Sequence, residues 1–347
     1  MHKFLSWPAP RPVKSSRMPP SAKSRQLSFT SAFVVWAIIV AAACFEGLRR
    51  GFHGRAFFIA LAVAAVLFAF ELFLAAPHVL GFAQRALGGR AAYLGPLVPL
   101  FAVLIYSLSV TGSGRLLLIG AAYAVLPAPL LASSAGKSPG TWEDYTALLL
   151  IALPAVLPVP TRLLYRVFPY PPPLSHTLAI LMAISTAVAA FVLLRRLDGV
   201  GYAVAWGRGF TANFALHFAI FAALAIPLGI TLGFLVYQPS IERARSSPLA
   251  ILGMLFFTAW PEEFLFRGLL QNLLSRTLKN QWAGLAVASV IFGFSHIFHA
   301  PYPNWKYVLL ATIAGLFYGH VWIRTRSLLP GTFVHALVDI SWHILFK

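Results

Sequence analysis

Charged residues are scarce in this chain, and acidic residues are the scarcest of them. The 347 residues include nine Asp and Glu, and Asp, Glu, Lys and Arg together make up 10% of the chain. A soluble domain devotes about a quarter of its residues to these four types, because water must cover its surface. The hydrophobic fraction is 59% and the mean hydropathy is +0.78. The composition therefore excludes an ordinary soluble protein and predicts a surface covered mostly by lipid.

Cysteine and clusters of basic residues are missing as well. Cys44 is the one cysteine, so the chain forms no internal disulfide and has no cysteine cluster to hold zinc. The net charge is +18, yet the basic residues are scattered singly between hydrophobic runs. Such scattering is typical of loops that lie against anionic lipid. It indicates the lipid bilayer, and not nucleic acid, as the partner of the positive charge.

Long hydrophobic runs are abundant. A membrane-spanning helix needs about 20 mostly apolar residues. The runs are continuous and rich in Ala and Leu, so they lack the alternation of a transmembrane barrel and indicate helices. We predict an all-α fold, namely a polytopic transmembrane helical bundle with about ten or eleven spans. The count is ten or eleven because the stretch 146–160 is short and contains two prolines. The other stretches lie near residues 30–47, 56–76, 92–110, 115–134, 176–194, 212–236, 249–274, 282–299, 305–324 and 328–346.

Three regions follow from this pattern. Residues 1–28 are polar, rich in Pro and Ser and free of acids, which predicts a basic disordered tail. Residues 29–240 are predicted to form an N-terminal transmembrane helical region to which the sequence assigns no role. Residues 241–347 hold most of the ionisable groups within apolar surroundings, and we predict that they form a catalytic core. The abundance of Ala, Arg and Pro favours a bacterial source and hence a multi-pass protein of the inner (cell) membrane.

Four carboxylates lie in or near hydrophobic runs. They are Glu71, Glu262, Glu263 and Asp339. A charge in hydrocarbon costs at least about 2.5–3.5 kcal/mol, so each of these carboxylates is expected to have a structural partner or a function that offsets this cost. Arg267 follows Glu263 by four residues, which places the two on one helix face and predicts a salt bridge. Glu262 points elsewhere and has no such partner, so its acidity indicates a function.

Histidines gather in the same region, because five of the ten lie after residue 295. His296 lies near the end of its predicted span. His335 and Asp339 are four residues apart on one helix face, so both can address one cavity. Each position alone fits a structural hydrogen bond. Together with Glu262 they occur in three of the last four predicted spans, which favours a shared function.

These side chains suit the hydrolysis of an amide. A carboxylate such as Glu262 in an apolar cavity can act as a general base, and with His296 it can hold and deprotonate a water. That water attacks an amide carbonyl, and His335 and Asp339, or nearby backbone donors, hold the developing oxyanion. Because an ionised Asp339 repels an oxyanion, we assign it the role of orienting His335.

Two further points complete the predicted site. Glu263 with Arg267 would support the helix that carries the base. A metal alternative uses the same atoms, since Glu262, His296, His335 and Asp339 are candidate ligands of a divalent metal such as zinc. The HExxH spacing of many zinc proteases is absent. The sequence therefore favours a mechanism without metal and leaves the metal mechanism as the alternative.

These residues form three short motifs along the chain: Glu262-Glu263-x-x-x-Arg267, Phe292-x-x-x-His296 and His335-x-x-x-Asp339. The order and spacing of the motifs resemble the three signature motifs of the CPBP family. This family contains the type II CAAX prenyl endopeptidases and bacteriocin-processing or bacteriocin-immunity proteins, and it is also called the Abi family. The resemblance covers about residues 250–345.

The resemblance implies a catalytic base at Glu262 with His296 beside it, and an oxyanion or ligand role for His335 and Asp339. The family's last motif ends in Asn or Asp, so Asp339 fits it. Members are described both as metalloproteases and as glutamate-dependent enzymes, so the resemblance leaves the metal open.

The predicted function is that of an intramembrane endopeptidase. Its substrate would be a membrane-associated protein or peptide, either a prenylated C-terminal tail or, as we favour, a bacterial protein with a hydrophobic sorting or leader segment. One alternative is a non-catalytic immunity or scaffold protein that keeps the fold. Another is a proton-coupled transporter, because buried Glu and His also form proton relays. The transporter is disfavoured because the site is confined to the last third of the chain and no paired repeats are seen.

Overall fold

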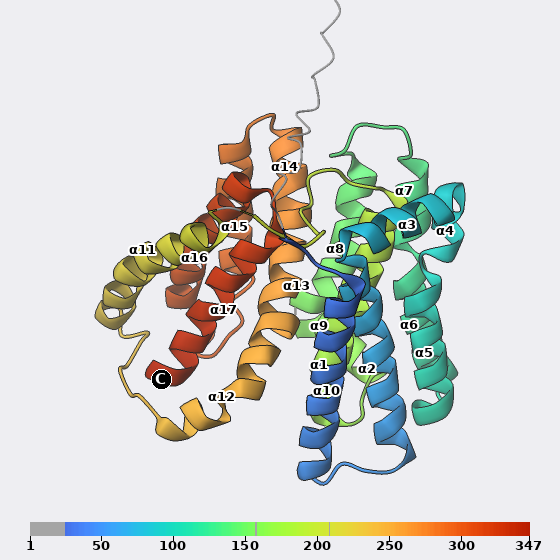
Figure 1. Cartoon of the computed structure of the whole chain (residues 1–347), viewed down its shortest axis with the longest axis horizontal. Coiled ribbons are helices and arrows are strands. Elements are labelled where there is room, and N and C mark those ends of the chain that lie inside the picture. Colours follow the sequence, from blue (N-terminus) through green and yellow to red (C-terminus); the bar gives the residue numbers. More distant parts are fainter. Residues whose placement is uncertain (1–24, 157, 208) are drawn as a thin grey trace, which may run out of the picture.

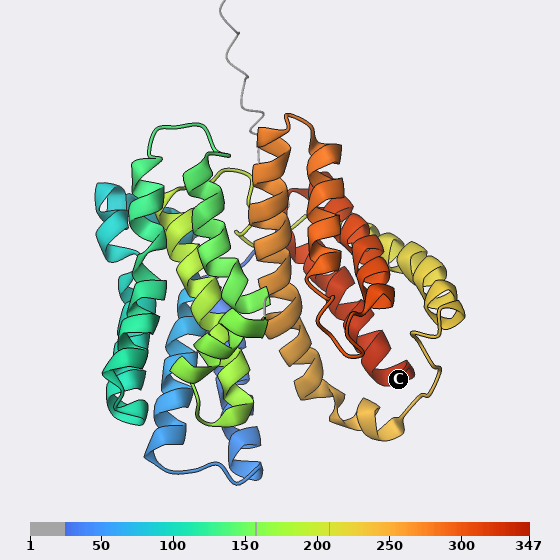
Figure 2. The ribbon, with the colours of Figure 1, turned by 180° about the vertical axis from the view of Figure 1, so that it is seen from behind.

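The computed structural model describes residues 25–156, 158–207 and 209–347, and its ribbon is helical almost throughout (Figures 1 and 2). An N-terminal group of helices, α1 to α10, stands beside a C-terminal group, α11 to α17. Most of the predicted basic tail, residues 1–24, lies outside the described residues. The end of that tail is ordered: Arg25–Gln26 (β1) pairs antiparallel with Ala205–Trp206 (β2), and Ser28 caps the first helix.

The N-terminal group consists of helices whose ends follow ordinary capping chemistry. The Ser28 hydroxyl accepts a hydrogen bond from the Ser31 amide at 3.0 Å, which starts α1. Prolines open α3, α7 and α10, where a missing amide hydrogen is tolerated. The helices are α1 (Phe29–Arg49), α2 (Arg55–Leu74), α3 (Pro77–Leu87), α4 (Ala91–Leu94), α5 (Leu97–Tyr106), α6 (Gly114–Val125), α7 (Pro127–Ser133), α8 (Trp142–Val156), α9 (Pro158–Val167) and α10 (Pro172–Ala187), which continues as a π-helix over Val188–Leu194.

The C-terminal group is built around one long helix that alternates between α-helical and π-helical geometry. Two π-helical segments, Leu255–Ala259 and Phe264–Gln271, join α12, α13 and α14 into a continuous rod in the middle of the molecule (Figure 1). Such wide turns recur at functional sites, because they re-aim side chains without ending the helix. The helices are α11 (Phe210–Thr231), α12 (Ile241–Met254), α13 (Trp260–Glu263), α14 (Asn272–Thr277), α15 (Gln281–Phe294), α16 (Trp305–Thr325) and α17 (Leu328–Leu345).

The number of spans differs from the prediction. Among the described residues, seven helices are long and apolar enough to cross a membrane, or eight if the bent pair Pro77–Leu94 and Leu97–Thr111 forms one span. The chain is thus an integral multi-pass membrane protein, but ten or eleven spans are not confirmed. Two physical causes account for the difference. The 14 residues of α15 extend only roughly 21 Å, and the rod α12–α14 carries charges inside its apolar stretch.

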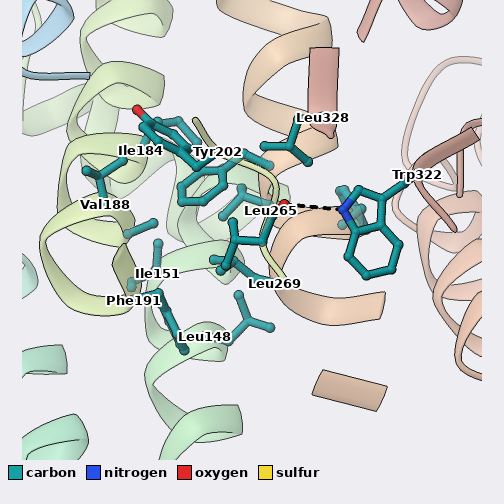
Figure 3. Close-up of a cluster of buried hydrophobic side chains, with 14 of the residues drawn as sticks. Leu148, Ile151, Ile184, Val188, Phe191, Tyr202, Leu265, Leu269, Trp322 and Leu328 are labelled. Carbon is teal, nitrogen blue, oxygen red and sulfur yellow. Dashed lines mark hydrogen bonds between the residues drawn. The ribbon is translucent and has the colours of Figure 1, made fainter. Parts of the chain in front are cut away.

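A buried hydrophobic cluster joins the two groups and sets the position of the rod. Figure 3 shows Leu265 and Leu269 of the rod packed toward Ile184 of α10 and Val188 of the π-helix that continues it. The connecting chain passes through this cluster, where the Trp322 indole donates to the Val200 carbonyl at 3.2 Å. The packing therefore fixes the rod against both groups of helices.

Glu71 is buried and hydrogen-bonded inside the N-terminal group. Its side chain is 3% exposed inside the N-terminal group, and the Ser185 hydroxyl of α10 donates to its Oε1 at 2.8 Å. The Tyr202 hydroxyl donates to the Glu71 carbonyl at 2.8 Å, which ties the connecting chain to α2. These contacts give Glu71 a structural role in joining α2, α10 and the connecting chain.

Small residues bring α15 and α16 close together. A Cβ on Gly293 would collide with Thr312, and a Cβ on Gly315 would lie 3.0 Å from Ser289. In a membrane, close backbone approach at small residues supplies much of the packing between helices. The short helix α15 is held in this way, and its end is placed beside the helices that carry the remaining motif residues.

Candidate active site

Glu262 and Glu263 lie on α13, between the two π-helical segments of the rod. The helix continues through Pro261, whereas the sequence suggested either a helix start or a kink there. The two carboxylates point in different directions, as expected from a turn of about 100° per residue. Glu263 is buried, with its side chain 1% exposed, and the Glu262 side chain is 31% exposed. The two acids therefore occupy different environments.

Glu263 pairs with Arg267, as the i,i+4 spacing predicted. Arg267 Nη1 lies 3.0 Å from Glu263 Oε1, and the Arg267 side chain is 2% exposed. The guanidinium carbon lies 4.2 Å from the centre of the Phe292 ring and 5.1 Å from that of Tyr318. Aromatic faces stabilise a desolvated cation. Arg267 is thus held by a carboxylate and by two rings.

His335 of α17 is where the motifs meet. Its Nδ1 lies 3.0 Å from Glu263 Oε1, and its Nε2 lies 3.7 Å from Asp339 Oδ2 and 3.8 Å from Glu262 Oε2. The Tyr318 ring stacks on the imidazole, with 4.6 Å between the ring centres and an angle of 20°. Three carboxylates and one aromatic face therefore fix this ring.

A second carboxylate contacts His335 besides Asp339, to which the sequence assigned the orientation of this ring. The nearest carboxylate is Glu263, at hydrogen-bonding distance from Nδ1. Gly331 permits this approach, because a Cβ there would lie 3.0 Å from Glu263 Oε2. The contact joins residues 72 apart in the chain, so no local spacing reveals it. Glu263 orients the imidazole, and Asp339 lies on the side of Nε2.

Glu262 carries an unpaired acceptor. Its Oε2 is buried and has no hydrogen-bond partner within the described part of the chain. A buried oxygen without a partner costs about 1–3 kcal/mol. The 3.8 Å from Oε2 to His335 Nε2 is too long for a direct hydrogen bond. Glu262 therefore has a free acceptor oxygen beside His335.

His296 lies in the turn that follows α15 and is 9% exposed. Its Nδ1 lies 2.8 Å from the Phe292 carbonyl oxygen, which requires a proton on Nδ1. A neutral imidazole in this tautomer leaves Nε2 as a free acceptor. Among the described residues His296 makes no ion pair with Glu262. His296 lines the first of two cavities together with His335 and Asp339.

Two cavities meet at this site. The first contains about 750 Å³ of empty space, part of it open to its surroundings, and is lined by His296, His335, Asp339 and many apolar side chains of α11, α16 and α17. The second is more polar and is lined by Arg243, Met254 and Thr258, among others. The residues that line both cavities are Tyr307, Asp339, Trp342 and Phe346.

The four predicted metal ligands do not form a metal site in this arrangement. Within residues 25–156, 158–207 and 209–347, no group of three or more His, Cys, Asp or Glu side chains has the geometry to hold a metal ion. His296 and His335 each use Nδ1 in a hydrogen bond, to the Phe292 carbonyl and to Glu263, and each keeps Nε2 free.

Comparison with known proteins agrees with this site. Residues 244–341 match the family model described as type II CAAX prenyl endopeptidase Rce1-like. No curated protein and no solved structure matches the chain. The matched range includes all three motifs, most of the rod, α15, α16 and most of α17. Over these residues the chain is similar to the type II CAAX prenyl endopeptidases, in agreement with the resemblance that its three motifs carry.

Proposed function

We propose that this chain is an intramembrane endopeptidase that hydrolyses a peptide bond in a membrane-associated protein by means of a water activated by Glu262 and His296. The observation that carries the proposal is the buried, unpaired Glu262 Oε2 beside His335. A water-activating base needs it free.

The proposed reaction proceeds in two proton transfers. The water oxygen attacks the peptide carbonyl carbon while Glu262 takes one water proton, and His296 Nε2 holds the water in place. The carbonyl oxygen becomes an oxyanion, to which a protonated His335 Nε2 donates a hydrogen bond. Glu262 then gives its proton to the leaving amide nitrogen, the C–N bond breaks, and the products are a carboxylate and an amine. Glu263 and Arg267 keep His335 oriented throughout.

The first cavity suggests the class of substrate. Its walls are mostly aromatic and aliphatic, and its polar end is formed by the site itself. A peptide with a long apolar group next to the scissile bond would place that group in the cavity and the bond beside His335. Hydrophobic leader or sorting segments of membrane proteins have this character, and they are the substrates that we propose, with the bacterial inner membrane as the location.

Filling the apolar cavity is expected to weaken binding of such substrates selectively. Ala222 of α11 lines the cavity, and the neighbouring Ala223 is exposed on the outer side of the helix. Ala222→Phe should raise KM tenfold or more for a substrate with a large apolar group, because burying such a group contributes about 1.5–3 kcal/mol. Steady-state kinetics with large and small apolar groups at the same position would measure this.

Ala223→Phe is the matched control, because it adds the same ring on the lipid-facing side. Its KM should equal that of the wild type for both substrates. Equal effects of the two substitutions would show that the cavity does not bind the apolar group.

The function itself is tested with purified protein reconstituted into liposomes together with membrane proteins of the source organism. New protein termini are then mapped by mass spectrometry, with empty liposomes as the reference. The proposal predicts a small set of new termini next to apolar residues. If no new termini form while the protein binds a membrane partner tightly, the chain is a non-catalytic relative and the proposal is wrong.

A further inference from the structure

The proposed reaction needs more hydrogen-bond donors than the motif residues supply. An oxyanion is stabilised by donors aimed at the position where the charge develops. Glu262 and Asp339 are acceptors when ionised. His296 uses its Nδ1 proton on the Phe292 carbonyl, and His335 uses its Nδ1 proton on Glu263. His335 Nε2 is therefore the one free donor among the four predicted residues.

Tyr307 lies beside His296 and lines both cavities. It is in the first turn of α16, where its backbone amide is fixed by a 3.0 Å hydrogen bond to the Asn304 side chain. Its ring centre lies 4.5 Å from that of His296 and 5.3 Å from that of Trp342. It lines both cavities, as Asp339 does. The residue therefore faces the space through which a substrate would pass between the cavities.

The Tyr307 hydroxyl differs from three tyrosine hydroxyls that are bound inside the protein. Tyr106, Tyr123 and Tyr202 each donate to a backbone carbonyl. Within the described part of the chain, the Tyr307 hydroxyl makes no hydrogen bond. A half-buried O–H group without a protein partner, on a residue that lines both cavities, is available to a ligand.

We propose, on the basis of the proposed endopeptidase function, that the Tyr307 hydroxyl donates a hydrogen bond to the oxygen of the attacked carbonyl and is a further catalytic residue. It acts with His335 Nε2, so that two donors hold the oxyanion. Tyr318 has a different role, because its ring lies flat on His335 and it is 1% exposed.

Tyr307→Phe is the decisive variant, since it removes no hydrogen bond within the described protein. It should lower kcat about 10²-fold, as the loss of one oxyanion donor does in other hydrolases. KM should stay close to the wild-type value. Affinity for a phosphinic peptide, whose tetrahedral phosphorus mimics the intermediate, should fall in parallel with kcat, because such analogues report transition-state binding.

Tyr106→Phe is the matched control, because it removes a buried hydroxyl from the N-terminal group, and it should change neither kcat nor phosphinic-peptide affinity. The inference is overturned if Tyr307→Phe retains most of the wild-type kcat, if it weakens substrate and phosphinic peptide equally, or if Tyr318→Phe carries the loss instead. A wild-type protein that cleaves nothing would instead overturn the endopeptidase function and this inference with it.

Discussion

Glu262→Gln is expected to reduce kcat by about 10²- to 10⁴-fold, the usual contribution of a general base. The substitution keeps the size and shape of the side chain but removes the group that accepts the water proton. The buried oxygen that has no protein partner in the wild type would belong to an amide, which does not take up a proton. Single-turnover cleavage of a substrate found by terminus mapping measures the effect.

The matched control is Glu242→Gln, which makes the same chemical change at an exposed residue near the start of α12. Its kcat should equal the wild-type value. The assignment of Glu262 as the base fails if Glu262→Gln, with an unchanged melting temperature, retains more than roughly a tenth of the wild-type rate, since that loss is smaller than a general base contributes.

Arg267→Met is expected to have the largest effect on stability. The side chain is 2% exposed and balances Glu263, which is 1% exposed. Removing one partner of a buried ion pair destabilises a protein by about 3–5 kcal/mol, because the remaining charge stays buried without compensation. The loss of the contacts with Phe292 and Tyr318 adds to this. Reversible unfolding in detergent micelles gives the change in free energy.

The double variant Arg267→Met/Glu263→Gln separates the cost of an uncompensated Glu263 charge from the cost of the lost contacts with Phe292 and Tyr318. Because it removes the uncompensated charge, it should recover most of the stability that Arg267→Met loses, while remaining inactive through the loss of His335 orientation. Arg49→Met, at a residue whose side chain is 63% exposed, should leave stability nearly unchanged. A single Arg267→Met variant as stable as Arg49→Met would show that the pair carries no buried charge.

The helical class of the fold follows from composition, but the number of spans does not. Continuous apolar runs determine that helices form in lipid, since their backbone groups must be satisfied internally. Run length fails as a measure of spanning where the helix ends early, as α15 does at Phe294, or where the run contains a charged site, as the rod does at Glu262 and Arg267. Both exceptions occur in the part of the chain that builds the site.

The site was predictable where its contacts are local. The four-residue spacing of Glu263 and Arg267 predicts their ion pair, and the spacing of His335 and Asp339 predicts that they share a face. The bond between His335 and Glu263 joins two distant helices and has no local signal. Tyr307 gave no signal either, because an aromatic residue in the first turn of a membrane helix ordinarily faces the interface.

A water bound by Glu262 is proposed to attack the peptide bond directly. Cleavage of the substrate in a single turnover in H₂¹⁸O tests this step. We expect one ¹⁸O atom in the new carboxylate of the first-turnover product and none in the protein. A first-turnover product without ¹⁸O, with the label found in the Glu262 carboxylate, would show a covalent acyl intermediate and exclude direct attack by water.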